Sequence, residues 1–379
     1  MSTFLILVLL VFLATLVHAS VLGGWRDRLL RMEVTRPEPT SPGPSISVVV
    51  PARNAERTIT FLLQDLHEQT LSKERYEVIV VDDASTDGTA ARVRSMATRW
   101  PGLQVVPAEG QGKKAAITTG VGRARHAWVL VTDADVRCGR ERLDVFARHL
   151  GATEDVLVGG PVRMTHRSGL PGTLQAEETA ALQGATLGSG IGGRPVLLNG
   201  ANMAFRKEVF ERMGGYAGDR WASGDDVFLL ERIVRHGGRA GVLPDQKAAV
   251  EVEPEYEWSG WWRQRLRWAG KMRGSRSVLG LVGGLAVLLL PWILLLVTAR
   301  FLGSAHVGMG LLRSGALLVA AWLLWVVPVL RLVGAVKRTW HVPHRPLASL
   351  LALLAFTVYA PLIAILSIFV RTTWKGRRV

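Results

Sequence analysis

The sequence predicts an α/β fold in which a globular domain, built on a mostly parallel sheet, is attached to a membrane by apolar helices. Between residues 46 and 256, short β-branched runs alternate with helix-like segments, and long uncharged apolar segments lie on both sides of this region. Strands that alternate with helices form parallel sheets that are covered on both faces. An apolar segment of roughly 20 residues is long enough to cross a bilayer.

Four segments contain no Asp, Glu, Lys or Arg, and they are residues 1–25, 277–299, 314–330 and 346–370. The first has the position of a secretory signal, but no basic residue precedes its apolar run, whereas Arg26, Arg28 and Arg31 follow it. Positive charge after a span keeps that flank in the cytoplasm. We therefore predict that residues 1–25 are an uncleaved anchor and that the following domain is cytoplasmic.

The three apolar segments within residues 277–370 pose a topological problem. If all three crossed the membrane, the basic region 331–345 would lie inside and the basic tail, residues 371–379, would lie outside. That arrangement goes against the tendency of Lys and Arg to stay in the cytoplasm. We predict that one segment does not span, and both the short segment 314–330 and the last segment, which contains Pro361, are candidates.

Charge and cysteine content restrict the partners. The formal net charge is +15, and much of the basic excess lies beside apolar segments, in residues 263–276, 331–345 and 371–378. Anionic lipid head groups attract charge placed in this way, so we predict an anionic membrane surface as the partner and no nucleic acid. The single cysteine, Cys138, excludes an internal disulfide framework and fits a reducing compartment.

Residues 26–45 are predicted to form a linker, because four prolines fall within residues 36–44. The domain that follows is expected to alternate strands and helices as far as residue 256. Strands are expected at 45–50, 77–81, 103–106, 128–132 and 156–160, and helices at 55–69, 86–99, 113–125 and 173–187.

Candidate binding residues, most of them polar, follow three of these strands. Pro51, Arg53 and Asn54 follow the first, Asp83 follows the second, and Asp133 and Asp135 follow the fourth. Ligands of parallel sheets bind at the carboxyl ends of the strands, so these residues together predict a nucleotide pocket. Taken alone, Asp83 fits a turn as well as a ligand. Carboxylate oxygens suit Mg²⁺ or Mn²⁺, which makes Asp133 and Asp135 candidate metal ligands.

Lys114 lies in the segment GQGKK, residues 110–114, which opens a predicted helix. Free N–H groups and a lysine at the start of a helix can meet a phosphate group. The segment lacks the spacing of a P-loop and does not support an ATPase.

Two later segments add further expectations. The glycine-rich residues 184–193 predict a mobile loop rather than a packed element. Asp225 and Asp226 open a predicted helix at 227–235. Acidic side chains there fit complementation of the helix dipole and also a general base, and the sequence leaves both interpretations open.

Residues 257–276 predict an amphipathic helix at the membrane interface. Trp258, Trp261 and Trp262 form an aromatic side, and basic and polar residues fall on another. Tryptophan favours the interface, and a helix of this kind can lie along the membrane surface. From this stretch alone, a membrane anchor and an active-site helix remain equally open.

Five segments stand out in order along the chain: VVVPARN (48–54), VVDDASTDGT (80–89), TDADV (132–136), SGDDVFLLERI (223–233) and QRLRW (264–268). In this order they resemble the family-2 glycosyltransferases with a GT-A fold, in the membrane-embedded branch of cellulose-synthase-like and hyaluronan-synthase-like enzymes and lipid glycosyltransferases. The resemblance covers residues 46–276 and makes residues 46–256 the expected GT-A catalytic domain.

The resemblance implies which residues bind the donor. Pro51, Arg53, Asn54 and Asp83 would border the uracil and ribose of a nucleotide sugar, with Lys114 nearby. Asp133 and Asp135 match the family's DXD motif, in which Asp135 would hold a divalent metal on the donor diphosphate.

The resemblance also implies the catalytic and acceptor residues. Asp226 matches the catalytic aspartate, and Asp225 replaces the glutamate that usually precedes it. Gly224 stands where the polysaccharide synthases usually have threonine. Gln264, Arg267 and Trp268 match QXXRW, which closes over the diphosphate and borders the acceptor, and Asn199 and Asn202 are expected on the acceptor side. Trp258, Trp261 and Trp262 would then face the membrane interface.

These expectations combine into one function. We expect an inverting transferase of the cell (inner) membrane that moves a sugar from a nucleotide sugar, UDP-linked, to a lipid or a growing polysaccharide. Mg²⁺ or Mn²⁺ would be the cofactor and Asp226 the general base. The alternative is a non-catalytic nucleotide-sugar-binding subunit of a polysaccharide export or synthesis complex.

Overall fold

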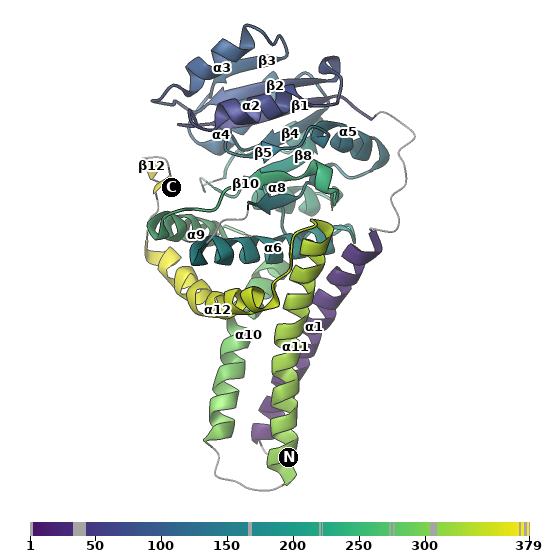
Figure 1. The fold of residues 1–379 in the computed structure, drawn as a ribbon, viewed down its shortest axis with the longest axis vertical. Coiled ribbons are helices and arrows are strands. Elements are labelled where there is room, and N and C mark those ends of the chain that lie inside the picture. Colours follow the sequence, from purple (N-terminus) through teal and green to yellow (C-terminus); the bar gives the residue numbers. More distant parts are fainter. Residues whose placement is uncertain are drawn as a thin grey trace.

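The computed structural model divides into a globular head and an elongated stem (Figure 1). It describes residues 3–32, 43–165, 169–219, 221, 223–272, 274–275, 277–303, 309–370, 373–374 and 377–378. The predicted linker falls largely on residues 33–42, which lie outside this description. Its first part does not form a linker, because helix α1 (Thr3–Met32) continues through it and places Leu29 in the core of the head.

The head is built on a seven-stranded sheet with the order β3-β2-β1-β4-β8-β6-β9. The strands are β1 (Ile46–Ala52), β2 (Tyr76–Asp82), β3 (Leu103–Pro107), β4 (Trp128–Thr132), β6 (Leu157–Gly159), β8 (Asn202–Arg206) and β9 (Ala240–Val242). The first four in chain order are mutually parallel, and β8 runs antiparallel to both β4 and β6. The mostly parallel α/β sheet predicted from the sequence is therefore confirmed.

Side-chain alternation along the strands builds a core on each face of this sheet. Val48 and Val50 of β1 belong to one buried cluster, and Val49 belongs to the other. Helices α2 (Ile59–His67), α3 (Thr89–Ala97) and α5 (Arg142–Ala152) contribute to the first cluster, and α4 (Lys113–Arg123), α7 (Lys207–Arg212) and α8 (Asp225–Arg235) to the second. The β-branched runs of the sequence are thus strands buried on both sides.

A smaller sheet lies against the first of these clusters. Its order is β5-β10-β7, with β5 (Arg137–Cys138), β7 (Val162–Met164) and β10 (Val250–Val252). Val162 and Val250 pair across β7 and β10, and both are buried in the first cluster. Two short 3-10 turns, η1 (Lys73–Arg75) and η2 (Gln246–Ala248), complete the head.

The glycine-rich segment corrects one prediction. Residues 184–190 are not a mobile loop but the last turns of helix α6 (Leu170–Gly190), and they are largely buried. A Cβ atom at Gly184 would lie 2.7 Å from the side chain of Leu332, and one at Gly188 would lie 2.4 Å from that of Trp25. The glycines are therefore needed for close packing of α6 against α11 and α1, which outweighs their low helix propensity.

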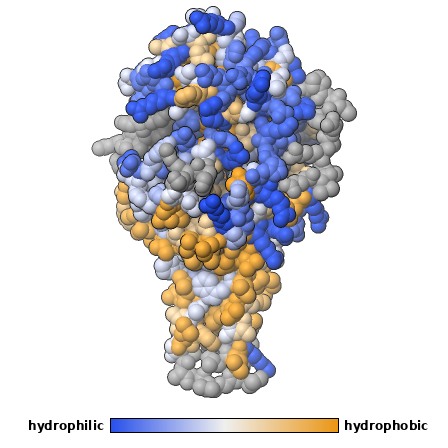
Figure 2. Space-filling model, in the orientation of Figure 1, coloured by the Kyte–Doolittle hydropathy of each residue, from blue (hydrophilic) through white to orange (hydrophobic). Residues whose placement is uncertain are grey.

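The stem consists of α1, α10 (Val278–Leu302) and α11 (Met309–Thr339), whose axes are roughly aligned; α1 and α11 run toward the head and α10 runs away from it (Figure 1). Val8, Leu294 and Trp325 lie in the apolar core that these helices share. The amino-terminal end lies at the far end of the stem from the head. Figure 2 shows apolar surface on the stem and the underside of the head, and polar surface over the rest of the head.

Helix α12 (Pro346–Phe369) has a different orientation, because it runs across the stem beneath the head (Figure 1). By length and composition it is one of four helices that could cross a membrane. One side carries a regular stripe of exposed apolar residues, and these are Leu347, Leu351, Leu354, Val358, Leu362, Ile365 and Phe369. The other side places Ser349, Ala352 and Ile363 in the interior. A helix with one apolar exposed side, lying across the spanning direction, fits the interface plane.

This orientation favours the last segment, rather than 314–330, as the one that does not cross. A cysteine at Thr373, in the short strand β11 (Thr373–Trp374) that pairs with β12 (Arg377–Arg378), should therefore label from the same membrane side as the head. A cysteine at Gly303, the end of α10 at the far end of the stem, should label from the opposite side and is the matched control. Both are made in a Cys138→Ser background and probed with a membrane-impermeant maleimide. Labelling of both positions from one side would contradict the assignment.

Candidate functional site

The loops that follow β1 and β2 are joined to each other at the carboxyl edge of the sheet. Arg53 Nη1 donates hydrogen bonds to the carbonyl oxygens of Asp83 at 2.6 Å and Ala84 at 2.9 Å. Asn54, at φ +45°, accepts a hydrogen bond from the Thr86 N–H at 2.8 Å. Pro51 is half-buried in β1 directly beside these loops. Four of the predicted nucleotide-binding residues are therefore brought together. The hydrogen bonds of Arg53 also hold the loop after β2 against the loop after β1, and these two loops form one wall of the predicted pocket.

Asp83 links this wall to the start of α4. Asp83 is 2% exposed, and its carboxylate accepts a hydrogen bond from the Gly112 N–H at 3.0 Å. The loop before α4 thereby lies beside the nucleotide side of the site, as the predicted pocket requires.

The lysine that enters the centre of the site is Lys113, not the predicted Lys114. Lys113 Nζ lies 2.8 Å from Asp133 Oδ1 and 3.0 Å from Asp225 Oδ2. Burial by itself lowers the pKa of Lys113, but the two carboxylates outweigh it and raise the pKa above its ordinary range. Lys113 therefore stays charged and joins the end of β4 to the start of α8.

Lys114 instead braces the wall behind the site. Its Nζ lies 3.1 Å from Asp219 Oδ2 and donates to the Trp221 carbonyl oxygen at 2.9 Å, and it lies 4.4 Å from the ring centroid of Phe228. Burial lowers the pKa of Lys114. Adjacent helical residues point about 100° apart, so only one of the two lysines can face the aspartates.

Asp133 and Asp135 follow β4 at the carboxyl edge of the main sheet. The Asp133 side chain is 34% exposed and Asp135 is exposed, so both carboxylates are accessible at the edge of the sheet. Among the described residues, no group of three or more His, Cys, Asp or Glu side chains could hold a metal alone. Mg²⁺ and Mn²⁺ are commonly held by one or two carboxylates plus substrate phosphates, which fits this pair.

The acid pair occupies the first turn of α8. Gly224, which precedes the pair, has φ +88°, a conformation that threonine adopts only with strain, so the backbone explains this departure from the polysaccharide synthases. Asp225 is 6% exposed and pairs with Lys113. A Cβ atom at Gly200 would lie 2.2 Å from Asp225 Oδ2, so glycine there is what lets the neighbouring loop approach this pair.

Asp226 is 8% exposed and is held from two directions. Lys271 Nζ lies 3.0 and 3.2 Å from its two carboxylate oxygens, and the Val227 N–H donates to it at 2.8 Å. Burial raises the pKa of Asp226, but the charges of Lys271 and Lys113 outweigh this effect and lower the pKa. The Asp226 carboxylate therefore accepts a hydrogen bond from an N–H of the first turn of α8 and is also ionised. Complementing the helix dipole and acting as a general base are thus compatible roles.

The predicted acceptor residues Asn199 and Asn202 are occupied within the fold. Asn199 accepts a hydrogen bond from the Ala201 N–H at 2.9 Å, which closes a turn. Asn202 is fully buried, accepts from Arg142 at 2.8 Å and donates to the carbonyl oxygens of Pro161 and Ala248. The structure does not support an acceptor role for Asn202, because its amide joins the two sheets.

Helix α9 (Trp258–Met272) carries the QRLRW segment. Burial lowers the pKa of Arg267, while Glu255, Asp133, Asp135 and Asp225 act in the opposite direction. Arg267 therefore lies close enough to these carboxylates to interact with them electrostatically. Gln264 Nε2 donates to Glu255 at 3.5 Å, and Trp268 is half-buried.

One part of the predicted division of labour on this helix is wrong. Trp258 is 46% exposed, as expected at an interface, but Trp261 is 3% exposed and contacts the ring of Tyr359 on α12 with centroids 4.9 Å apart. The sequence shows an aromatic side, and it does not show whether lipid or another helix covers it.

Two side chains that the sequence did not single out hold α9 in place. Arg265 is 4% exposed, lies 5.0 Å from the ring centroids of both Trp261 and Trp268, and forms an ion pair with Glu178 of α6. The position of Arg265 inside QRLRW could have indicated these ring contacts, because it lies four residues after Trp261 and three before Trp268 and so shares a helix face with both.

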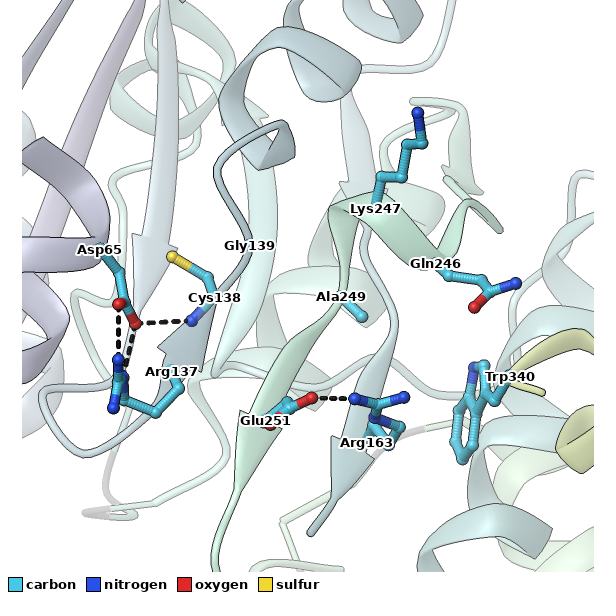
Figure 3. Close-up of a pocket in the computed structure, with 10 residues that line it drawn as sticks. All are labelled: Asp65, Arg137, Cys138, Gly139, Arg163, Gln246, Lys247, Ala249, Glu251 and Trp340. Atoms are coloured by element: carbon cyan, nitrogen blue, oxygen red, sulfur yellow. Dashed lines mark hydrogen bonds and ion pairs between the residues drawn. The ribbon is translucent and has the colours of Figure 1, made fainter. Parts of the chain in front are cut away.

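A cavity of about 530 Å³ lies away from these residues, on the small sheet (Figure 3). Arg137, Arg163 and Glu251 line it from β5, β7 and β10, and Trp340 closes one end. Its arginines are paired with Asp65 and Glu251. None of the predicted site residues lines it, so the candidate site is the edge of the main sheet.

Comparison with known proteins agrees with this fold. Residues 47–214 match the family described as Glycosyl transferase family 2. The chain is 29% identical to "Probable glycosyltransferase YdaM" of Bacillus subtilis (strain 168), over 73% of this chain and 67% of that protein. It is 31% identical to "Glycosyltransferase AglE" of Haloferax volcanii, over 52% of this chain and 64% of that protein. The chain therefore spans about two thirds of the length of these relatives.

The mannosyltransferase PcManGT from Pyrobaculum calidifontis, in complex with GDP-Man and Mn²⁺, has a similar fold. The TM-score is 0.56 at 24% sequence identity, over 93% of this chain and 99% of that one. Four helices are long and apolar enough to cross a membrane, which agrees with the membrane association predicted from the sequence. The chain is therefore a glycosyltransferase with a GT-A fold, and its residues 47–214 form a family-2 domain.

Proposed function

We propose that this chain is an inverting transferase that moves a sugar from a nucleoside diphosphate donor to a lipid-linked acceptor at the cytoplasmic membrane surface. The observation that carries the proposal is the convergence of Asp133, Asp225 and Asp226 with Lys113 and Arg267 at one edge of the sheet. Carboxylates and cations gathered in this way suit a reaction in which a hydroxyl loses a proton and a diphosphate leaves.

Asp226 is the proposed general base. The acceptor hydroxyl gives its proton to the Asp226 carboxylate while its oxygen attacks the anomeric carbon of the donor sugar, opposite the leaving group. The bond from that carbon to the diphosphate oxygen breaks in the same displacement, so the configuration inverts. Arg267 supplies positive charge that stabilises the departing diphosphate.

Asp133 and Asp135 would hold a divalent cation, which when bound neutralises charge on the diphosphate as a Lewis acid. The structurally similar PcManGT binds GDP-Man together with Mn²⁺, which supports a diphosphate donor and a divalent cation here. The shorter Asp225 still reaches a cation, because Lys113 lies 3.0 Å away. The aspartate that stands in place of the usual glutamate therefore still makes an ion pair in the site, which supports an active enzyme over a non-catalytic subunit.

The stem favours a lipid acceptor over a growing polysaccharide. Its interior is filled by apolar side chains, among them Val11, Leu294, Ala321 and Trp325. A polysaccharide that crosses a membrane needs a polar path, and the described residues of this core do not offer one. Helix α12 beneath the head would bring the site to the level of lipid head groups.

The test uses the full chain in lipid vesicles with a panel of UDP-linked and GDP-linked sugars. One donor should release nucleoside diphosphate only with Mg²⁺ or Mn²⁺ present, because the two carboxylates need the cation to bind the diphosphate. Chelation should abolish release, and Asp135→Asn should raise the metal concentration needed, whereas Asp87→Asn, which removes a turn carboxylate, should not. Mass spectrometry should find one sugar added to a lipid. A ladder of products would overturn the lipid acceptor, and turnover without metal would overturn the metal site.

A further inference from the structure

Helix α9 makes a contact with the acid pair that the QRLRW motif does not include. Lys271 lies three residues beyond Trp268, near the end of the helix. Its Nζ lies 3.0 Å from Asp226 Oδ1 and 3.2 Å from Oδ2, and both side chains are largely enclosed, at 17% and 12% exposed. The helix that covers the donor side therefore also touches the proposed base.

We propose that Lys271 is a positioning residue for the reaction, which keeps the Asp226 carboxylate ionised and fixes the direction in which it faces the acceptor hydroxyl. The proposal deepens the function proposed above and rests on it, because it needs Asp226 to be the base. It adds a role for a residue outside every motif that identified the family.

The other charged and titratable neighbours of Asp226 are engaged with other partners, so Lys271 is the residue that can ionise and orient its carboxylate. Lys113 also acts on Asp226 from α4, but its Nζ is committed to Asp133 and Asp225. Lys114 is committed to Asp219 and the Trp221 carbonyl. Tyr216 donates its hydroxyl hydrogen to the Asp225 carbonyl oxygen, and Asp225 itself adds a like charge next along the helix. Of these neighbours, Lys271 is the cation in direct contact with the Asp226 carboxylate.

A carboxylate this deeply buried would otherwise favour its protonated form. An opposite charge within about 4–6 Å lowers a carboxyl pKa by roughly 1–3 units, and loss of that charge leaves the desolvation effect unopposed. A general base works only when deprotonated, so a low pKa for Asp226 keeps the enzyme active toward acidic pH. Removal of the Lys271 charge should raise the pKa and move the acidic limb of activity to higher pH.

The two contacts also fix orientation. The Val227 N–H and Lys271 together hold Oδ1, and Lys271 alone of the two reaches Oδ2. Loss of Lys271 should therefore lower kcat even where Asp226 is fully ionised, because the carboxylate can turn away from the acceptor. A role limited to stability would leave the pH profile unchanged.

The experiment measures kcat and kcat/KM against pH for the full chain in vesicles, with the active donor of the panel and saturating metal at each pH. Lys271→Gln should shift the acidic limb of kcat/KM upward by about 1–3 pH units. Lys271→Arg should keep the limb within a few tenths of a unit of the wild type. Lys247→Gln is the matched control, since Lys247 pairs with Glu141 on the exposed surface. If Lys271→Gln does not fold, Lys271→Met replaces it, because a side chain of similar length keeps the packing.

The outcomes separate this proposal from the function on which it rests. If Asp226→Asn keeps full turnover, the base assignment itself fails. If Asp226→Asn is inactive but the profiles of Lys271→Gln and the wild type superimpose, the base stands and the role of Lys271 is overturned. A shift in Lys271→Gln that Lys271→Arg restores supports the proposal.

Discussion

Asp226→Asn should reduce kcat for sugar transfer by about 10²–10⁴-fold, the range that general base catalysis contributes. The amide cannot accept the hydroxyl proton, yet it has nearly the shape of the carboxylate and can still accept the Val227 hydrogen bond. Binding of the nucleotide should change little, because the base acts on the acceptor. Sugar transfer is measured as the release of nucleoside diphosphate, and the affinity for the donor is measured by calorimetry.

Asp144→Asn is the control for this substitution. Asp144 makes an i,i+4 pair with Arg148 on α5, with both side chains more than one third exposed, so the same loss of charge should leave transfer unchanged. Full turnover by Asp226→Asn, with the protein folded, would remove Asp226 from the reaction.

Glu178→Ala should lower the free energy of unfolding by about 3–5 kcal/mol, the usual cost of leaving one member of a buried ion pair without its partner. Arg265 is 4% exposed and cannot reach water without moving α9. Its remaining hydrogen bonds to Gln175 and Gln264 do not supply a counter-charge. Denaturant unfolding in detergent, followed by tryptophan fluorescence, measures the difference.

Two comparisons make this second prediction specific. Glu208→Ala removes an ion pair to Arg212 whose side chains are 82% and 66% exposed, and such surface pairs contribute at most about 1 kcal/mol. The double variant Glu178→Leu with Arg265→Met should recover most of the loss, because an apolar pair of similar size needs no counter-charge. Equal effects of Glu178→Ala and Glu208→Ala would contradict the prediction.

The elements that local sequence determines were predicted well. The runs around Val48, Val80 and Val131 read as buried strands because β-branched residues flanked by helical segments have few other stable arrangements. The polar residues at their ends could be gathered into one site because parallel strands point their carboxyl ends to the same edge.

The errors come from contacts between segments far apart in the sequence. Gly184 and Gly188 looked mobile because their composition does not reveal Leu332 and Trp25, which pack against them. Lys113 and Lys114 could not be distinguished without knowing the rotation of α4. Asn202 looked available because nothing in the chain around it indicates Arg142 as its partner.

The close approach of α6 to α1 and α11 has a consequence for how the enzyme reaches its acceptor. Leu29, Leu332 and Val336 lie in the same buried cluster as Val49 and Val131 of the central sheet, so the ends of two stem helices complete the interior of the catalytic domain. The head cannot swivel on the stem without opening that interior. If the acceptor is lipid-linked, as proposed, the site would be held at a constant height above the bilayer, and an acceptor would be selected in part by how far its reactive hydroxyl projects from the lipid.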